Sequence, residues 1–398
     1  MEIKEEEKAS NMDLKLRLAK IMYFFFAISF FISALVTCGG AMTILLIVWP
    51  FSKPLYRRIV SYFGYTMFAQ AVFMLRYWST ADLKLYIDRE VYDKYLGKEH
   101  SLCILNHSGE LDWIIMSALL DKLNILGNVK AYMKNAVKFI PFVGWGFYCC
   151  EFIYLTRSFE KDKIILKKSA QDLSEYEDPI TILLFPEGTR FSPKKHEEAL
   201  KFSRERGLRE MKHHLVPRTK GFTTSVPYMK DKIPALYDIE IAFDGVKPTI
   251  TNMIKARRFN VHMYLRRIPM AEVPDTEKEQ DLYLRDMFYR KDECMESFRK
   301  TGDFFKLTNQ QPLDPITIEP NVNCLYNVIF WFIVSLSPII YFLFKMLLSK
   351  QYLYFVIFIT CIGLGFRVLA KSIDNMEVKD TKLKKNNNVE NGEKIKSS

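Results

Sequence analysis

Residues 101–113 read SLCILNHSGELDW, and this stretch carries the central structural signal of the chain. Its first part, Leu102–Leu105, is a short apolar run of the length typical of a buried strand. Polar residues follow at once, beginning with Asn106 and His107. His107 therefore lies just past the end of a predicted strand, where α/β proteins build their active sites.

Three further apolar runs have the same character and extend the fold assignment. They lie at Ile180–Phe185, Ile239–Phe243 and Val261–Leu265, and a helical stretch surrounds Lys163–Leu173. Strands that alternate with helices favour a mainly parallel sheet covered by helices. We therefore predict an α/β fold for residues 79–318.

His107 and Asp112 form a candidate catalytic pair. A reaction in which an alcohol attacks needs a base, because an alcohol is a poor nucleophile until its proton is being removed, and histidine suits that task near neutral pH. A carboxylate on the other ring nitrogen fixes the tautomer and stabilises the imidazolium. Five positions on one helix rotate the chain by about 500°, so the pair can meet only across a turn, which Gly109 would permit. Taken alone, the spacing also fits two unrelated surface residues.

Residues 185–190, FPEGTR, form a second candidate motif and again follow a predicted strand. Arg190 carries a planar guanidinium group that suits a phosphate. Gly188 lets the backbone approach a ligand closely, and Glu187 could hold Arg190 or bind a hydroxyl. The alternative is a Pro-Gly turn with an ordinary ion pair.

Composition restricts the classes of function, beginning with a formal net charge of +11 over 398 residues. Such a charge suits an anionic membrane, an anionic substrate or nucleic acid, but no nucleic-acid motif accompanies it, so we expect no nucleic-acid partner.

Seven cysteines without a CxxC pair predict reduced, mostly buried thiols rather than disulfides or a zinc site. The sequence contains no GxSxG, which argues against a serine hydrolase of the usual kind. His213 and His214 lack a partner at metal-ligand spacing and are expected at the surface.

Apolar residues gather near both ends of the chain. The first run, Ile21–Ser52, has no charged residue and as one helix would be about 48 Å long, beyond the roughly 30 Å of a hydrocarbon core. It is either one strongly tilted span or two helices hinged at Gly39-Gly40. A second run, Ile59–Leu75, fits an interfacial or re-entrant segment, with a buried core helix as the alternative. Toward the C-terminus, Asn321–Phe344 and Gln351–Phe366 predict a transmembrane hairpin.

These runs divide the chain into five parts. Residues 1–20 form an N-terminal tail, and residues 21–78 hold the N-terminal membrane segments. The α/β domain covers residues 79–318, and the C-terminal hairpin covers residues 321–370. Residues 371–398 are rich in Lys, Asn and Glu and are expected to be disordered.

The two motifs together resemble those of the glycerophospholipid acyltransferases, specifically the 1-acylglycerol-3-phosphate O-acyltransferases. That family pairs an NHxxxxD segment with a later FPEGTR segment, and both occur here in that order. Two further blocks fit, KNAVKFIPFVGW from Lys134 and EFIYLTR ending at Arg157, and a last block begins at Val216-Pro217. The resemblance covers roughly residues 85–310, with a family-type C-terminal extension after about residue 240. Basic residues soon after FPEGTR make the chain similar to the longer eukaryotic branch.

The resemblance implies transfer of a fatty acyl group from acyl-CoA to the sn-2 hydroxyl of lysophosphatidic acid, giving phosphatidic acid. It implies His107 as the base and Asp112 as its partner, with no acyl-enzyme intermediate, no metal and no cofactor besides the co-substrate acyl-CoA. The residues that it implies in substrate binding are Lys134, Arg157, Glu187, Gly188, Thr189, Arg190, Pro217 and Lys220. The alternatives are lysophosphatidylinositol, lysocardiolipin or glycerol-3-phosphate as the acceptor, a hydrolase that uses the same pair, and a catalytically silent membrane scaffold.

Two residues depart from the family pattern. Glu151 stands where many members have glycine. Arg218 follows Pro217 where an apolar residue is usual. Both departures bear on acceptor preference more than on the reaction itself.

The expected location is the endoplasmic reticulum membrane. Acceptor and product are both lipids, so membrane lipids are expected partners. Lys394 and Lys396 resemble the KxKxx signal that returns membrane proteins to this compartment, although a lysine-rich tail matches it about as readily by chance. If that tail is cytosolic and residues 321–366 form a hairpin, the catalytic domain is cytosolic as well. We therefore expect a multi-pass or re-entrant protein with a cytosolic catalytic domain.

Overall fold

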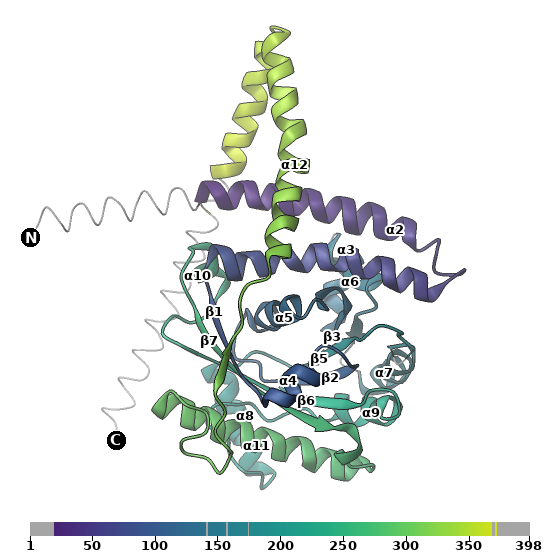
Figure 1. The fold of residues 1–398 in the computed structure, drawn as a ribbon, viewed down its shortest axis with the longest axis vertical. Helices are drawn as coiled ribbons and strands as arrows, with labels where there is room; N and C mark the ends of the chain where they lie inside the picture. The colour runs from purple at the N-terminus through teal and green to yellow at the C-terminus, as the bar shows by residue number, and fades with distance from the viewer. Residues whose placement is uncertain (1–19, 141, 157, 174, 368–370, 372–398) are drawn as a thin grey trace, which may run out of the picture. The chain divides into compact units, whose positions relative to one another are not determined.

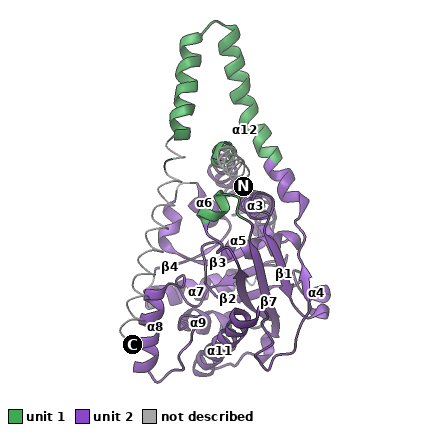
Figure 2. Ribbon diagram, turned by 90° about the vertical axis from the view of Figure 1, so that its left-hand side faces the viewer, with its two compact units in different colours: residues 1–32, 250–257, 329–398 green, residues 33–249, 258–328 purple. Residues whose placement is uncertain are grey.

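The computed structural model describes most of the chain as helices and strands (Figure 1). The described residues are 20–140, 142–156, 158–173, 175–367 and 371. They belong to two compact units (Figure 2). The larger unit contains residues 33–249 and 258–328, and the smaller contains the described parts of 1–32, 250–257 and 329–398.

An eight-stranded sheet lies at the centre of the larger unit's described residues, in the order β4-β3-β5-β2-β6-β7-β1-β8. Five neighbouring pairs are parallel, whereas β6–β7 and β1–β8 are antiparallel. The strands are β1 (Asp82–Tyr86), β2 (Ser101–Leu105), β3 (Val129–Lys134), β4 (Ile153–Leu155), β5 (Thr181–Leu184), β6 (Ala235–Asp244), β7 (Asn260–Pro269) and β8 (Pro315–Thr317). The predicted α/β class with a mainly parallel sheet is confirmed, and the four predicted runs coincide with β2, β5, β6 and β7.

Helices cover both faces of this sheet, with α7, α9 and α11 on one face and α3 and α5 on the other (Figure 1). The principal helices are α3 (Lys53–Phe73), α4 (Arg89–Lys94), α5 (Asp112–Lys122), α6 (Val143–Cys149), α7 (Phe159–Leu173), α8 (Pro193–Glu205), α9 (Lys220–Met229), α10 (Ile250–Ile254), α11 (Glu277–Thr301) and α12 (Val322–Leu348). Shorter or π-helical turns are η1 (Leu35–Ala41), α2 (Met42–Leu45), η2 (Met74–Trp78), η3 (Leu126–Asn128), η4 (Asn135–Phe139) and η5 (Met270–Glu272).

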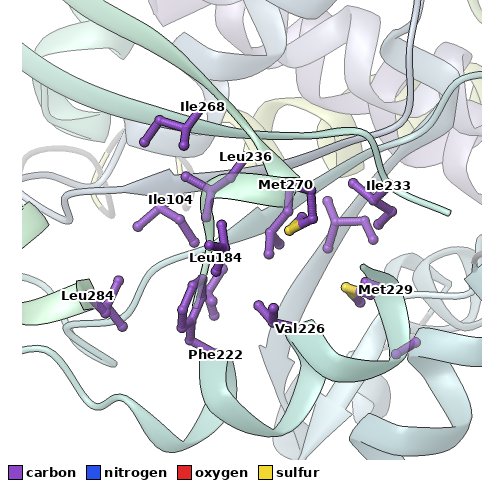
Figure 3. Close-up of a cluster of buried hydrophobic side chains, with 14 of the residues drawn as sticks. Ile104, Leu184, Phe222, Val226, Met229, Ile233, Leu236, Ile268, Met270 and Leu284 are labelled. Carbon is purple, nitrogen blue, oxygen red and sulfur yellow. The ribbon is translucent and has the colours of Figure 1, made fainter. Parts of the chain in front are cut away.

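The hydrophobic core against the sheet explains why the central strands β2, β5 and β6 are apolar runs in the sequence. Ile104, Leu184 and Leu236 face Phe222 and Val226 of α9 (Figure 3). β2 is buried at every position, because helices cover it from both sides. Each large apolar side chain buried here contributes roughly 1.5–3 kcal/mol relative to exposure. This packing holds the carboxyl ends of β2 and β5 in fixed positions.

The second N-terminal run forms α3 and η2, and one face of α3 is core. Tyr56, Val60 and Phe68 are among its buried residues. The ring of Phe68 stacks on Phe147 and Phe152, with centroids 5.8 and 5.9 Å apart. The structure therefore favours the alternative of a buried helix on this face over a wholly interfacial or re-entrant segment.

Two described helices have the length and apolar composition to cross a membrane, Lys20–Leu45 and Val322–Leu348. The first continues through Gly39-Gly40, where η1 forms a π-helical turn. A hinge between two shorter helices at these glycines is therefore wrong, because the wider turn keeps the backbone helical. In the smaller unit, the end of α12 and the apolar helix Tyr352–Arg367 form a helical hairpin.

The remaining predictions fall on the tails and the thiols. Residues 1–19 and 372–398, which hold the predicted tails and the KxKxx-like signal, lie outside the described residues. Six of the seven cysteines are buried and Cys361 is exposed, and all seven are unpaired. The prediction that the thiols are mostly buried is thus confirmed.

Candidate active site

Four parallel strands deliver the sequence motifs to one edge of the sheet. β2 pairs with β5, β5 with β3, and β3 with β4, all in parallel. Their carboxyl ends therefore lie together, and parallel sheets bind ligands at such an edge. His107 follows β2, residues 185–190 follow β5, and Lys134 is the exposed last residue of β3. Arg157, beyond the end of β4, lies outside the described residues.

The candidate pair is formed. Nδ1 of His107 lies 3.0 Å from Oδ2 of Asp112. The side chain of His107 is 23% exposed and that of Asp112 only 2%. No hydrogen-bond partner of Nε2 of His107 occurs among the described residues, so this nitrogen is available to a ligand. A buried carboxylate thus orients the imidazole through Nδ1, an arrangement that suits a general base.

A tight turn brings the two side chains together, as their spacing requires. Asp112 begins α5, where the helix dipole favours a carboxylate. The backbone N–H of Gly109 donates to Oδ2 of Asp112 at 2.8 Å. A Cβ on Gly109 would lie 3.2 Å from Oδ1 of Asp112, so glycine is favoured by the close approach. The turn predicted at Gly109 is confirmed.

The second motif fixes the main chain of His107 from both sides. Glu187 accepts the His107 N–H on Oε1 at 2.7 Å and the Leu215 N–H on Oε2 at 3.0 Å. The carbonyl oxygen of His107 accepts the N–H of Phe191 at 2.8 Å. Burial raises the pKa of Glu187, while nearby His214 and the two N–H donors oppose that rise.

These bonds correct one role considered for Glu187. It does not hold Arg190, because its carboxylate is buried and each oxygen already accepts a backbone N–H. Arg190 instead bonds through Nη1 to Oε1 of Glu110 at 2.8 Å, on the surface. The two motifs are joined by the bond from the His107 N–H to the Glu187 carboxylate, by the Phe191–His107 main-chain bond and by this exposed ion pair.

The other described residues predicted to bind substrate are Gly188, Thr189, Pro217 and Lys220. Thr189 accepts a hydrogen bond from Lys195 of α8. Pro217 is buried, and Lys220 at the start of α9 lies 2.6 Å from Glu277 of α11. Gly188 has φ +66°, a conformation that glycine adopts without strain.

Four residues that the sequence analysis did not connect form a buried hydrogen-bonded network behind the first motif. They are Asn106, Glu240, His214 and Asp292. Nδ2 of Asn106 donates to Oε1 of Glu240 at 2.9 Å. Nε2 of His214 lies 3.0 Å from the same oxygen, and its Nδ1 lies 3.0 Å from Oδ1 of Asp292. The surface position expected for His214 is wrong, since its side chain is only 1% exposed. Asp292 belongs to α11, 78 residues away, so no local pattern marks this contact.

His214 is held as a cation between two carboxylates. Burial by itself lowers the pKa of His214, but Glu240 and the Asp292 hydrogen bond outweigh burial and raise it to about 10. Burial likewise raises the pKa of Asp292, and the hydrogen bond and charge of His214 reverse that effect, leaving this pKa below its usual value. Lys291 adds a second buried cation, 3.7 Å from Oε2 of Glu240.

The structure explains the first departure from the family pattern. Glu151 has φ +57°, the left-handed region that glycine adopts most readily. Its carboxylate bonds Nε and Nη2 of Arg57 in α3, each at 3.0 Å, and accepts from Tyr176. A buried fork of this kind offsets the backbone cost of a non-glycine residue here. Glu151 thus bonds α3 rather than facing the carboxyl edge of the sheet.

Comparisons with known proteins agree with this architecture. Residues 86–226 match the family "Acyltransferase", and residues 252–331 match "Acyltransferase C-terminus". 1-Acyl-sn-glycerol-3-phosphate acyltransferase delta of Mus musculus is 33% identical over 82% of this chain and 83% of its own length. The gamma enzyme of Homo sapiens is 31% identical over 80% of this chain and 83% of its own length. The chain therefore belongs to the 1-acyl-sn-glycerol-3-phosphate acyltransferase family and is an acyltransferase with that family's C-terminal extension.

Proposed function

We propose that this acyltransferase moves a fatty acyl group from acyl-CoA to the sn-2 hydroxyl of lysophosphatidic acid. The single observation that carries the proposal is the His107–Asp112 pair at 3.0 Å, with Nε2 of His107 unbonded among the described residues. This geometry suits removal of a proton from an alcohol. The names of the delta and gamma relatives support the choice of acceptor.

The reaction is one displacement at the thioester carbonyl. The acceptor oxygen attacks the carbonyl carbon while its proton passes to Nε2 of His107. Asp112 keeps Nδ1 protonated and stabilises the imidazolium that forms. The C–S bond then breaks, and the departing CoA sulfur receives the proton from His107. Acyl-CoA and a lysophospholipid are the two substrates, and the products are phosphatidic acid and CoA.

The turn after β5 is proposed to recognise the acceptor phosphate. The Arg190–Glu110 pair has side chains 52% and 37% exposed. An exposed pair of this kind stabilises a protein by only about 0–1 kcal/mol, so a phosphate can replace the carboxylate. Lys134 at the same edge adds positive charge, whereas Glu187 positions the main chain of His107.

An acceptor panel tests this function. Purified full-length protein is given one acyl-CoA with lysophosphatidic acid, lysophosphatidylinositol, lysocardiolipin or glycerol-3-phosphate, and each product is quantified. We expect phosphatidic acid to form with the highest kcat/KM. A higher kcat/KM with another acceptor would reassign the substrate. Free fatty acid without any acceptor would indicate a hydrolase, and no turnover at all would favour a silent scaffold.

We also propose that the enzyme resides in the endoplasmic reticulum membrane with its catalytic domain in the cytosol. The two long apolar helices support membrane association. The expected topology can be measured by protease protection on sealed microsomes, with one epitope tag after Gly207 and another at the C-terminus. Gly207 suits a tag, because an added Cβ there would meet nothing within 4 Å. Cleavage of both tags without detergent is expected, and protection of the Gly207 tag would place the active site in the lumen.

A further inference from the structure

Arg218, the second departure from the family pattern, lies across the turn of the FPEGTR motif. A Cβ placed on Gly188 would be 3.1 Å from Cδ and 3.3 Å from Nε of Arg218. The backbone N–H of Arg218 donates to the carbonyl oxygen of Pro186 at 2.7 Å. The arginine stem therefore packs on the bare backbone of Gly188, where any other residue would crowd it.

Three cations near Arg218 in the sequence or at the motif turn already have partners. Arg190 pairs with Glu110, Lys195 bonds Thr189, and Lys220 pairs with Glu277. Arg218 is exposed, and its guanidinium has no ion-pair or hydrogen-bond partner in the part of the chain that the structure describes. An exposed cation fixed only by its stem and main chain is ready to bind an anion without first breaking an ion pair.

The carboxylate of Glu187 links the segment that contains Arg218 to the backbone of His107. Glu187 bonds the backbone of His107 with one oxygen and that of Leu215, three residues before Arg218, with the other. The same turn continues to Phe191, whose N–H bonds the carbonyl oxygen of His107. Arg218 thus stands on the ligand-binding edge of the sheet, beside the residues that hold the proposed base.

We propose that Arg218 binds a phosphate group of a substrate and acts as a specificity-determining residue of this acyltransferase. A guanidinium fork suits a phosphate monoester, because it offers parallel N–H donors and stays charged. This proposal rests on the proposed function, in which the acceptor carries such a phosphate. CoA is also a phosphate ligand, so the shared chemistry is a phosphate and the two sources must be separated by experiment.

The test compares Arg218→Ala, Arg218→Gln and Arg218→Lys with the wild-type full-length enzyme. KM is measured for lysophosphatidic acid at saturating acyl-CoA, and for acyl-CoA at saturating acceptor. Loss of a hydrogen bond to a charged group should raise one KM about 10- to 100-fold in the Ala and Gln variants, with a smaller change in kcat. Lys should restore part of the affinity, because it keeps the charge but not the fork. The substrate whose KM rises identifies the source of the phosphate.

Arg206→Ala is the matched control. Arg206 is also exposed, and its guanidinium lies over Phe202, 5.6 Å from the ring centroid, rather than on the motif turn. Removing its charge should leave both KM values near wild type. If neither KM changes in Arg218→Ala and Arg218→Gln while the wild type turns over normally, the role of Arg218 is refuted and the proposed function stands. If Arg218→Gln has near-wild-type KM values while Arg218→Ala does not, packing on Gly188 rather than charge is responsible. That result would also refute the proposed role of Arg218.

Discussion

Replacement of His107 by alanine is expected to lower acyl transfer about 10²- to 10⁴-fold, the usual contribution of general acid–base catalysis. The reason is that the acceptor hydroxyl then lacks the Nε2 acceptor for its proton. The backbone bonds of His107 to Glu187 and Phe191 do not involve the side chain, so the fold should be kept. The rate of phosphatidic acid formation by the purified variant measures the effect, with thermal unfolding recorded alongside.

Two further variants decide whether that loss reflects catalysis. Asp112→Asn should also be severe, because an amide permits the wrong imidazole tautomer. His213→Ala is the control, since His213 bonds Glu296 on α11 and lies outside the proposed catalytic pair. Near-normal turnover by His107→Ala, or an equal loss in His213→Ala, would contradict the proposed base.

The largest effect on stability is expected from His214→Ala. This change removes the imidazolium that bonds the buried carboxylates of Glu240 and Asp292. Breaking a buried pair by deleting one partner typically costs about 3–5 kcal/mol. A loss of that size should lower Tm by on the order of 10 °C, measurable by thermal unfolding of the purified protein.

The matched control is again the adjacent histidine. The side chains of His213 and Glu296 are each 23% exposed, whereas that of His214 is 1% exposed. A largely solvated pair contributes only about 0–1 kcal/mol, so His213→Ala should shift Tm far less. Equal shifts in the two alanine variants would contradict the buried-cation assignment.

The effect of His214 should depend on pH. Its pKa in the folded protein is raised to about 10, above the value near 6.5 of an unfolded histidine. The stability from its charge is therefore fully present below about pH 6.5 and is lost as pH rises through about 10. The Tm difference between wild type and His214→Ala should thus shrink between pH 7 and pH 10. A constant difference over that range would indicate a neutral His214.

Loss of the buried network of Asn106, Glu240, His214 and Asp292 should also affect the active site. Glu240 accepts a hydrogen bond from Asn106, the residue before His107, so we expect a displacement of Glu240 to disturb the first motif. This link connects α11, in the C-terminal extension, to the candidate base. It gives the extension a structural reason to accompany the acyltransferase domain.

Sequence by itself determined the sheet class and the location of both motifs. Strands covered on both faces must be apolar at nearly every position, so β2 and β5 are visible as short runs such as Leu102–Leu105. The spacing of His107 and Asp112 required a turn, because a helix would separate the side chains, and Gly109 marks that turn. The strands and the turn depend on residues that are close together in the sequence, so a single sequence is enough to predict them.

Only the tertiary structure decided which charged residues meet. Glu187 bonds the backbone of His107 rather than Arg190, and His214 is buried against Asp292 rather than lying at the surface. Buried polar groups are tolerated only where partners satisfy them, and those partners come from elements far apart in the chain. Burial and long-range pairing have no local sequence period. The fold could therefore be predicted from the apolar pattern, whereas the polar network behind the site could not.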